Sequence, residues 1–192
     1  MKNTSAKLVL ITGILLIAGA LWLYFNPWPG WADKESQSWQ LTIVGRDGAE
    51  RVLSFKEITS LPAYRGEGGF FSTVGIVYGP YKVKGVPLED LCRLVGGLEP
   101  SDAVMVSAQD GYSTVLDYEQ VMGDFITYSA DLKEVPHQQL KTILIYQREG
   151  RWLPDDEGKP LRLAVAGPSP GLLIEGNYWV KWVNRIEVLK AP

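Results

Sequence analysis

Two hydroxyl side chains, Ser72 and Thr73, lie in a stretch that is rich in glycine, GEGGFFSTVGIVYGP, from Gly66 to Pro80. Glycine has no Cβ, so a loop of this composition lets a ligand come close to the backbone. Backbone amides can bind a phosphate group, but the Walker spacing and the Gly-x-Gly-x-x-Gly turn of dinucleotide-binding proteins are both absent. The stretch predicts a ligand-binding loop without identifying the ligand.

Residues that bind metals or act as nucleophiles are few. The chain has one cysteine, Cys92, and one histidine, His137. A zinc site needs about three or four such ligands, so a zinc centre is excluded. A Ser-His-Asp hydrolase would depend on His137, which lies in a polar segment, and the chain has no Gly-x-Ser-x-Gly motif. A single cysteine also excludes an internal disulfide.

An acidic run, Asp155-Asp156-Glu157, is the remaining candidate for ion binding. A calcium loop needs alternating oxygen ligands along the chain, and this run does not provide them. We therefore expect a solvated loop here.

The elements that position these residues are mainly strands. An Asp-Gly turn predicts a hairpin from residues 39–55, and the capping box from Ser54 to Glu57 predicts a short helix that ends before Pro62. Residues 87–95, PLEDLCRLV, predict a second helix, with proline in the first turn and glycines after its end. Its apolar periodicity places Cys92 on the buried face, where we expect a structural thiol.

Further strands follow along the chain. Residues 177–189, NYWVKWVNRIEVL, predict one continuous strand of period two, with Lys181 and Arg185 on the same face and roughly 13 Å apart. Other apolar segments with the character of strands are AVMVSA, YSTVLDY, FITYSA, TILIYQ and LRLAVAG. The fold class is therefore α+β, a strand-dominated domain with a mixed sheet.

The N-terminus has a different composition from the rest of the chain. Residues 8–25 contain no charge and no proline, which is close to the minimum length for a transmembrane helix. Lys2 and Lys7 precede this segment and tryptophans follow it, so we expect the remainder to face the periplasm or the cell exterior. A cleaved signal peptide is the alternative, with cleavage after Ala20 or Ala32. The predicted organisation is an anchor at 1–25, a tether at 26–38 and one domain at 39–192.

The charge of the chain argues against nucleic acid as a partner. The formal net charge is −3, and the only charges before Asp33 are the two lysines, so the domain itself is more acidic still. An acidic surface repels a phosphate backbone. The expected partners are a membrane and a redox protein of the cell envelope.

The order of five segments resembles the oxidoreductase molybdopterin-binding domain family, which has the fold of sulfite oxidase. The most specific pieces are Gly85-Val86-Pro87-Leu88, the Asp110-Gly111-Tyr112 signature, and Lys181-Trp182 with Arg185-Ile186-Glu187. They lie between SFKEITSLP and YWVKWVNRIEV in the order that the family has. The resemblance covers residues 41–189 and implies a sulfite oxidase-type domain that binds a molybdopterin.

The same resemblance implies one cysteine ligand for molybdenum, in the loop before the Gly-Val-Pro-Leu helix. In this chain Ser72, Thr73 and Gly75 occupy that loop, so no thiolate is present there. A thiolate is a soft anionic donor, whereas a hydroxyl binds a metal only when the metal deprotonates it. A serine oxygen does serve as the ligand in enzymes that resemble dimethyl sulfoxide reductase.

Cofactor anchoring is a separate question, because the phosphate of a pterin needs cations and amide donors. The resemblance makes Asp110, Gly111, Tyr112, Lys181 and Arg185 cofactor-binding candidates, together with Ser72, Thr73 and Gly75. Lys82 and Lys84 share another strand face. Each of these cations is equally well explained as a solvent-facing residue of a strand.

Three readings stay open at this point. The first is a degenerate, membrane-anchored family member that holds no molybdenum. The second is an active molybdopterin-dependent oxidoreductase in which Ser72 or Thr73 replaces the cysteine. The third is a tethered domain of unrelated all-β topology.

Overall fold

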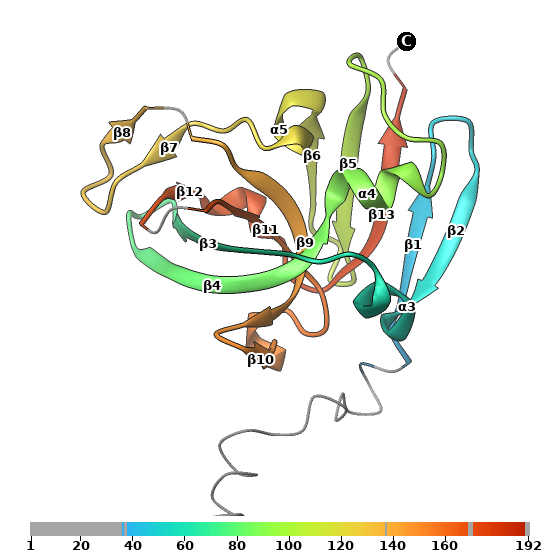
Figure 1. The fold of residues 1–192 in the computed structure, drawn as a ribbon, viewed down its shortest axis with the longest axis horizontal. Coiled ribbons are helices and arrows are strands. Elements are labelled where there is room, and N and C mark those ends of the chain that lie inside the picture. Colours follow the sequence, from blue (N-terminus) through green and yellow to red (C-terminus); the bar gives the residue numbers. More distant parts are fainter. Residues whose placement is uncertain (1–35, 37, 137, 169–170, 191–192) are drawn as a thin grey trace, which may run out of the picture. The chain divides into compact units, whose positions relative to one another are not determined.

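Two β-sheets form the domain (Figure 1). The first has the strand order β2-β1-β13-β5-β6, in which β1 and β13 are parallel and the other pairs are antiparallel. This mixed pairing confirms the predicted mixed sheet. Its strands are β1 (Gln40–Val44), β2 (Glu50–Ser54), β5 (Ala103–Ala108), β6 (Ser113–Asp117) and β13 (Val183–Leu189).

The second sheet has the order β10-β9-β4-β3-β12-β7-β8, and β11 pairs with β9. A bridge between Glu67 and Gly167 joins the end of β11 to β3, so that β3, β4, β9 and β11 close into a ring. The strands are β3 (Tyr64–Phe71), β4 (Val77–Pro87), β7 (Thr127–Tyr128), β8 (Glu134–Val135), β9 (Lys141–Arg148), β10 (Arg151–Trp152), β11 (Arg162–Ala166) and β12 (Leu173–Glu175).

The structure is a computed structural model that describes residues 36, 38–136, 138–168 and 171–190. The predicted anchor at 1–25, most of the tether and His137 lie outside these residues. Within the described ranges, no helix is both long and apolar enough to cross a membrane.

The helices are short and follow the predicted capping. In α3 (Phe55–Ser60) the Ser54 hydroxyl accepts from the Glu57 N–H and the Glu57 carboxylate accepts from the Ser54 N–H, which confirms the capping box. The others are α4 (Leu88–Arg93), α5 (Tyr118–Met122) and the 3-10 turns η1 (Asp155–Glu157) and η2 (Gly176–Tyr178).

The core forms around α4, which contacts β1, β4 and β9 and so links the two sheets. Leu88, Leu91 and Cys92 of this helix are fully buried. They lie among equally buried side chains such as Ile43 of β1 and Leu144 of β9. The prediction that Cys92 is a buried core residue is therefore confirmed.

The predicted strand at 177–189 is wrong in its first half. Residues 176–178 form the turn η2, Trp182 has a φ of 51°, and the strand begins only at Val183. A bulge between Val183 and Arg185 then places Val183 and Ile186 in the core. Lys181 is therefore not on the strand that carries Arg185, and the 13 Å spacing does not apply.

Candidate ligand-binding site

The glycine-rich stretch is a hairpin and not a loop. β3 and β4 pair along it, and only the turn around residues 72–76 leaves the ladder. Gly68 is next to the β11 backbone, since a Cβ there would lie 2.2 Å from the Val165 carbonyl oxygen. Gly66 is in the same position against Gly167. These two glycines therefore admit a neighbouring strand and not a ligand, which corrects the sequence-based interpretation.

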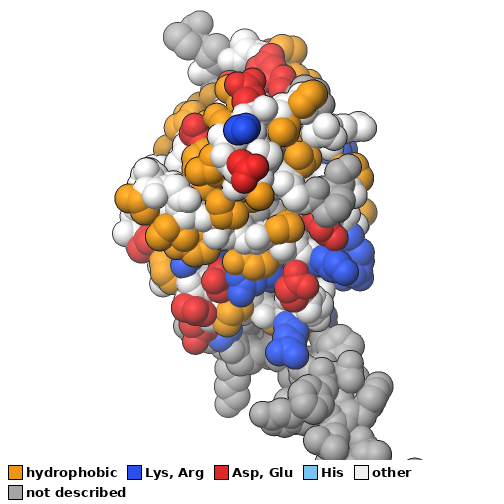
Figure 2. Space-filling view, turned by 90° about the vertical axis from the view of Figure 1, so that its left-hand side faces the viewer, with side chains coloured by type: hydrophobic (Ala, Val, Ile, Leu, Met, Phe, Trp, Pro, Cys, Tyr) orange, Lys and Arg blue, Asp and Glu red, His pale blue; other side chains and the backbone are white. Residues whose placement is uncertain are grey.

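The hairpin turn positions Ser72. The Ser72 N–H donates to the Ile76 carbonyl at 2.9 Å, and the Ser72 hydroxyl accepts from the Ile76 N–H at 3.1 Å. Gly75 has a φ of 79°, which the tight turn requires. Val74 and Ile76 of the turn are exposed, and Figure 2 shows hydrophobic side chains interspersed with charged ones at this end of the domain.

A pocket of about 480 Å³ opens beside the turn. It brings together four of the predicted site residues, namely Ser72, Asp110, Tyr112 and Lys181. They come from three separate parts of the chain, the β3–β4 turn, the β5–β6 turn and the segment after η2. A volume of this size is typical of small-molecule sites.

The other predicted residues lie elsewhere. Thr73 and Gly75 are exposed in the hairpin turn, and Gly111 is exposed between Asp110 and Tyr112 in the β5–β6 turn. Arg185 lies on β13, where its guanidinium pairs with Glu187 at 3.1 Å. Arg185 therefore does not line the pocket that Lys181 borders.

The β5–β6 turn reaches across to η2. The Asp110 carboxylate accepts from the Tyr112 N–H at 3.0 Å, which holds the turn. The Tyr112 hydroxyl donates to the Asn177 carbonyl at 3.3 Å. Tyr112 is 48% exposed, so it is not packed beneath the turn and instead borders the pocket.

Arg162 and Trp179 form the buried wall of the pocket, and the sequence analysis did not identify either of them. Arg162 is 3% exposed and Trp179 is 4% exposed. The guanidinium carbon lies 5.2 Å from the Trp179 ring centroid and 5.1 Å from that of Phe70. One signal was present, since Arg162 is a charged residue within the apolar segment LRLAVAG, and charged residues are rarely fully buried without a partner.

The partner of Arg162 is Glu157. The Glu157 carboxylate accepts from Arg162 at 2.5 Å and forms an ion pair with Arg148 at 3.0 Å. Burial lowers the pKa of Arg162 and the Glu157 charge opposes this change. Arginine stays protonated in proteins, so two cations share one carboxylate here.

The acidic run is therefore part of the pocket wall and not simply a solvated loop. Besides the Glu157 pairs, the Asp156 carbonyl accepts from Lys181 Nζ at 2.5 Å. The Asp155 carbonyl accepts from Trp182 Nε1 at 3.1 Å. In this way η1 holds Lys181 and Trp182 at the edge of the pocket.

Two buried donors in this wall have no partner among the described residues. They are Arg162 Nε and Trp179 Nε1. A buried donor without an acceptor costs about 1–3 kcal/mol, and buried polar groups normally find a partner. A polar ligand in the pocket would supply acceptors for such groups.

Comparison with known proteins places this geometry in a family. The model of the family described as "Oxidoreductase molybdopterin binding domain" matches residues 72–192. This chain belongs to the oxidoreductase molybdopterin-binding domain family. The resemblance inferred from the five sequence segments is thereby confirmed.

Two known proteins are similar to this molybdopterin-binding domain, one in sequence and one in structure. The sulfite oxidase of Arabidopsis thaliana is 27% identical over 177 residues, which cover 80% of this chain and 42% of that protein. The sulfane dehydrogenase SoxCD of Paracoccus pantotrophus has the same fold, with a TM-score of 0.62 and 18% identity over 83% of this chain and 40% of its own. The chain thus spans less than half the length of either relative.

The pocket residues fit the organic part of a molybdopterin better than a thiolate-bound metal. The unpartnered donors of Arg162 and Trp179, with aromatic rings beside them, suit a polar heteroaromatic ligand. The only thiol, Cys92, is fully buried in the core, and burial raises its pKa to about 12. The described residues also contain no group of three or more His, Cys, Asp or Glu side chains that could hold a metal.

Proposed function

We propose that this domain is a non-catalytic member of the molybdopterin-binding family, which binds a pterin ligand without a metal held by a protein thiolate. The observation that carries the proposal is the pocket wall, in which Arg162 Nε and Trp179 Nε1 are buried donors with no acceptor in the described part of the chain. When bound, a molybdopterin with its metal supplies oxidation–reduction chemistry. The residues of this chain supply recognition.

Each part of the wall has a role in such binding. Arg162, fixed by Glu157, offers a second N–H to an acceptor of the ligand, and the rings of Phe70 and Trp179 offer flat apolar faces. Lys181 adds a positive charge at the edge of the pocket, where a phosphate group can remain partly hydrated. These contacts bind the ligand and transfer no electrons.

Ser72 supports the alternative of an active oxidoreductase. Its hydroxyl is at the pocket, whereas that of Thr73 is in the exposed part of the turn. The Ile76 N–H donates to this oxygen, and it could continue to donate to the alkoxide after a metal had deprotonated the hydroxyl. On this alternative Ser72, and not Thr73, is the ligand.

The location and partner belong to the same proposal. The uncharged segment 8–25, with Lys2 and Lys7 before it, supports a membrane anchor and a domain outside the cytoplasm. The exposed apolar side chains at the hairpin turn, Val74, Ile76 and Val77, support contact with a redox protein of the envelope.

Ligand content tests the recognition role. Full-length protein purified from a host that makes the cofactor should contain bound pterin. Trp179→Phe should reduce that content because it keeps a flat aromatic face but removes the indole N–H together with the five-membered ring. Trp39→Phe is the matched control, since it makes the same change at a tryptophan that does not line this pocket and whose N–H donates to the Val183 carbonyl. Equal pterin content in Trp179→Phe and wild type would contradict the assigned role of the donor.

Metal content separates the two readings. Ser72→Cys and Thr73→Cys introduce a thiol at the turn, and the variant that gains molybdenum identifies the position that faces the metal. If wild-type protein already contains molybdenum and Ser72→Ala loses it while Thr73→Ala does not, the active alternative is correct.

A further inference from the structure

A second pocket, of about 470 Å³, lies along β3, β4 and β9. The residues that line it include Arg65, Lys82, Lys84, Glu67, Gln147 and Gly150. Among the described residues it shares none with the ligand pocket beside Ser72. Arg65 and Lys84 lie toward the open end of the hairpin, whereas Ser72 lies at its turn. We refer to this second pocket as the basic groove.

The register of the strands brings its cations together. Arg65 pairs directly with Lys84 across β3 and β4, and Lys84 pairs with Gln147 across β4 and β9. Lys82 is two residues from Lys84 and lies on the same face. Like charges directly opposite each other on a sheet are destabilising, so folding alone does not favour the Arg65–Lys84 pair.

None of these three cations forms an ion pair within the described chain, although one carboxylate, that of Glu67, lies in the same groove. Glu67 pairs in register with Lys82 but forms no ion pair with it. Glu149 is also near, yet its carboxylate accepts from the Lys82 backbone N–H at 2.6 Å. By contrast, Arg162 at the ligand pocket and Arg148 at the end of β9 both pair with Glu157. The groove thus presents three cations whose charges are available to a ligand.

One of these cations is held in place. The ammonium group of Lys84 lies 5.4 Å from the centroid of the Tyr146 ring, a cation–π contact. Tyr146 is fully buried and packs against Phe55 and Trp152. Its hydroxyl has no hydrogen-bond partner among the described residues. A preorganised side chain loses less entropy on binding.

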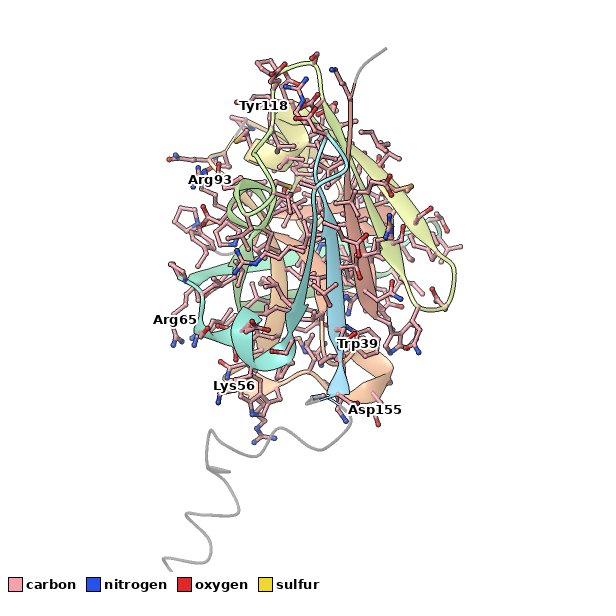
Figure 3. All side chains as sticks on the ribbon, turned by 90° about the vertical axis from the view of Figure 1, so that its right-hand side faces the viewer. Trp39, Lys56, Arg65, Arg93, Tyr118 and Asp155 are labelled. Carbon is pink, nitrogen blue, oxygen red and sulfur yellow. The ribbon has the colours of Figure 1, made fainter. Side chains whose placement is uncertain are left out.

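Arg65 completes the set from the opposite strand. Figure 3 shows its side chain at the edge of the domain, pointing away from the ribbon. An arginine presents two parallel N–H donors to an oxyanion, and lysines add point charges. A phosphate group offers oxygens to donors on several sides, which suits one arginine and two lysines better than a single carboxylate does.

We propose that the basic groove binds the phosphate group of an anionic ligand through Arg65, Lys82 and Lys84. Two sources have this chemistry, a soluble phosphate and the headgroup of an anionic phospholipid. The proposal is independent of the pterin pocket, because no described residue is common to both.

Calorimetric titration of the full-length protein in non-ionic detergent tests the proposal. The probes are inorganic phosphate, glycerophosphoglycerol as the headgroup of an anionic lipid, and glycerophosphocholine as a zwitterionic control. If inorganic phosphate binds and glycerophosphoglycerol does not, the natural ligand is a soluble phosphate. If glycerophosphoglycerol binds more tightly than inorganic phosphate, the natural ligand is a lipid headgroup. Either result supports the proposal, whereas no binding of any probe, or binding of glycerophosphocholine alone, overturns it.

Matched variants locate the binding. Arg65→Gln and Lys84→Gln should each weaken it about tenfold, the loss expected for one hydrogen bond to a charged group. Lys56→Gln, on α3 (Figure 3), should leave it unchanged. The unfolding temperature of Lys84→Gln should change little, because the substitution removes both the repulsion from Arg65 and the cation–π contact with Tyr146. Equal binding by wild type and Lys84→Gln, or an equal loss in Lys56→Gln, overturns the assignment.

Discussion

Arg162 and Glu157 are joined by a hydrogen bond of 2.5 Å in the wall of the ligand pocket, and the same Glu157 oxygen lies 3.0 Å from Arg148. Arg162 is almost fully buried, whereas the Glu157 side chain is 24% exposed. This pair fixes the guanidinium whose Nε–H has no partner among the residues that the structure describes. The stability of the wall and its ability to bind a ligand therefore depend on the same carboxylate.

Glu157→Gln should reduce the free energy of unfolding by about 2 kcal/mol, because it leaves the buried charge of Arg162 without a counter-ion. Removal of one partner of a fully buried pair costs about 3–5 kcal/mol, and the partial exposure of Glu157 reduces this value. Chemical denaturation measures the change. Asp155→Asn is the control, since that side chain is 81% exposed and its ion pair within the described residues is with Lys159. Its change should stay within about 0.5 kcal/mol.

Gly68→Ala should destabilise the domain by about 3 kcal/mol, because the new Cβ would lie 2.2 Å from the Val165 carbonyl oxygen in the β11 backbone. Gly167→Ala is the comparison. Its nearest neighbour is the end of the Leu140 side chain, at 2.7 Å, which can move aside. Thermal unfolding should show a larger loss for Gly68→Ala, and an equal loss would contradict the packing of β3 against β11.

Cys92 should react very slowly with a thiol reagent in the native protein. It is fully buried and its pKa is raised to about 12, so the reactive thiolate is scarce and shielded. Thr73→Cys, in the exposed turn, should react at once and provide the positive control. If Cys92 were labelled as fast in the native wild-type protein as in the denatured protein, this residue would be accessible and the prediction would be wrong.

The capping box predicts a dependence of stability on pH. Hydrogen bonds from Ser54 lower the pKa of Glu57 below its ordinary value of 4.5. A depressed pKa in the folded state contributes stability that is complete above about pH 4.5 and is lost as the pH falls through the folded value. Ser54→Ala and Glu57→Gln should both flatten this acid limb in denaturation curves between neutral and acid pH. If both variants kept the wild-type dependence of stability on pH, the capping box would not be the source of that dependence.

Local sequence signals predicted the elements whose ends and faces depend on neighbouring residues. The Ser54–Glu57 box and the α4 periodicity that buries Cys92 are both present. The predicted hairpin at residues 39–55 also forms, as β1 and β2 around their Asp-Gly turn. Each of these rests on contacts within a few residues, which the sequence displays directly.

Elements that depend on distant contacts were harder to predict. The strand at 177–189 is interrupted at Trp182, whose indole donates to Asp155, twenty-seven residues earlier. The glycines at 66 and 68 suggested a ligand because the strand that approaches them, β11, lies almost one hundred residues later in the chain. The need for glycine at positions 66 and 68 becomes clear only from the closed ring of β3, β4, β9 and β11, in which β11 lies against β3.

The candidate site was predicted in part. Ser72, Asp110, Tyr112 and Lys181 meet in one pocket, as their positions in the family order implied. Arg185 does not, because the bulge after Val183 sets the face on which it lies. Arg162 and Trp179 were missed because each resembles an ordinary strand or loop residue until η1 brings Glu157 against them.

The molybdenum and pterin content of the wild-type, full-length protein from a cofactor-producing host tests the central claim most directly. Elemental analysis gives the metal per chain, and fluorescence of the oxidised pterin gives the ligand per chain. We predict pterin with molybdenum far below one atom per chain, because the chain offers no accessible thiolate. Molybdenum near one per chain would contradict the account and assign the metal to a hydroxyl at the hairpin turn.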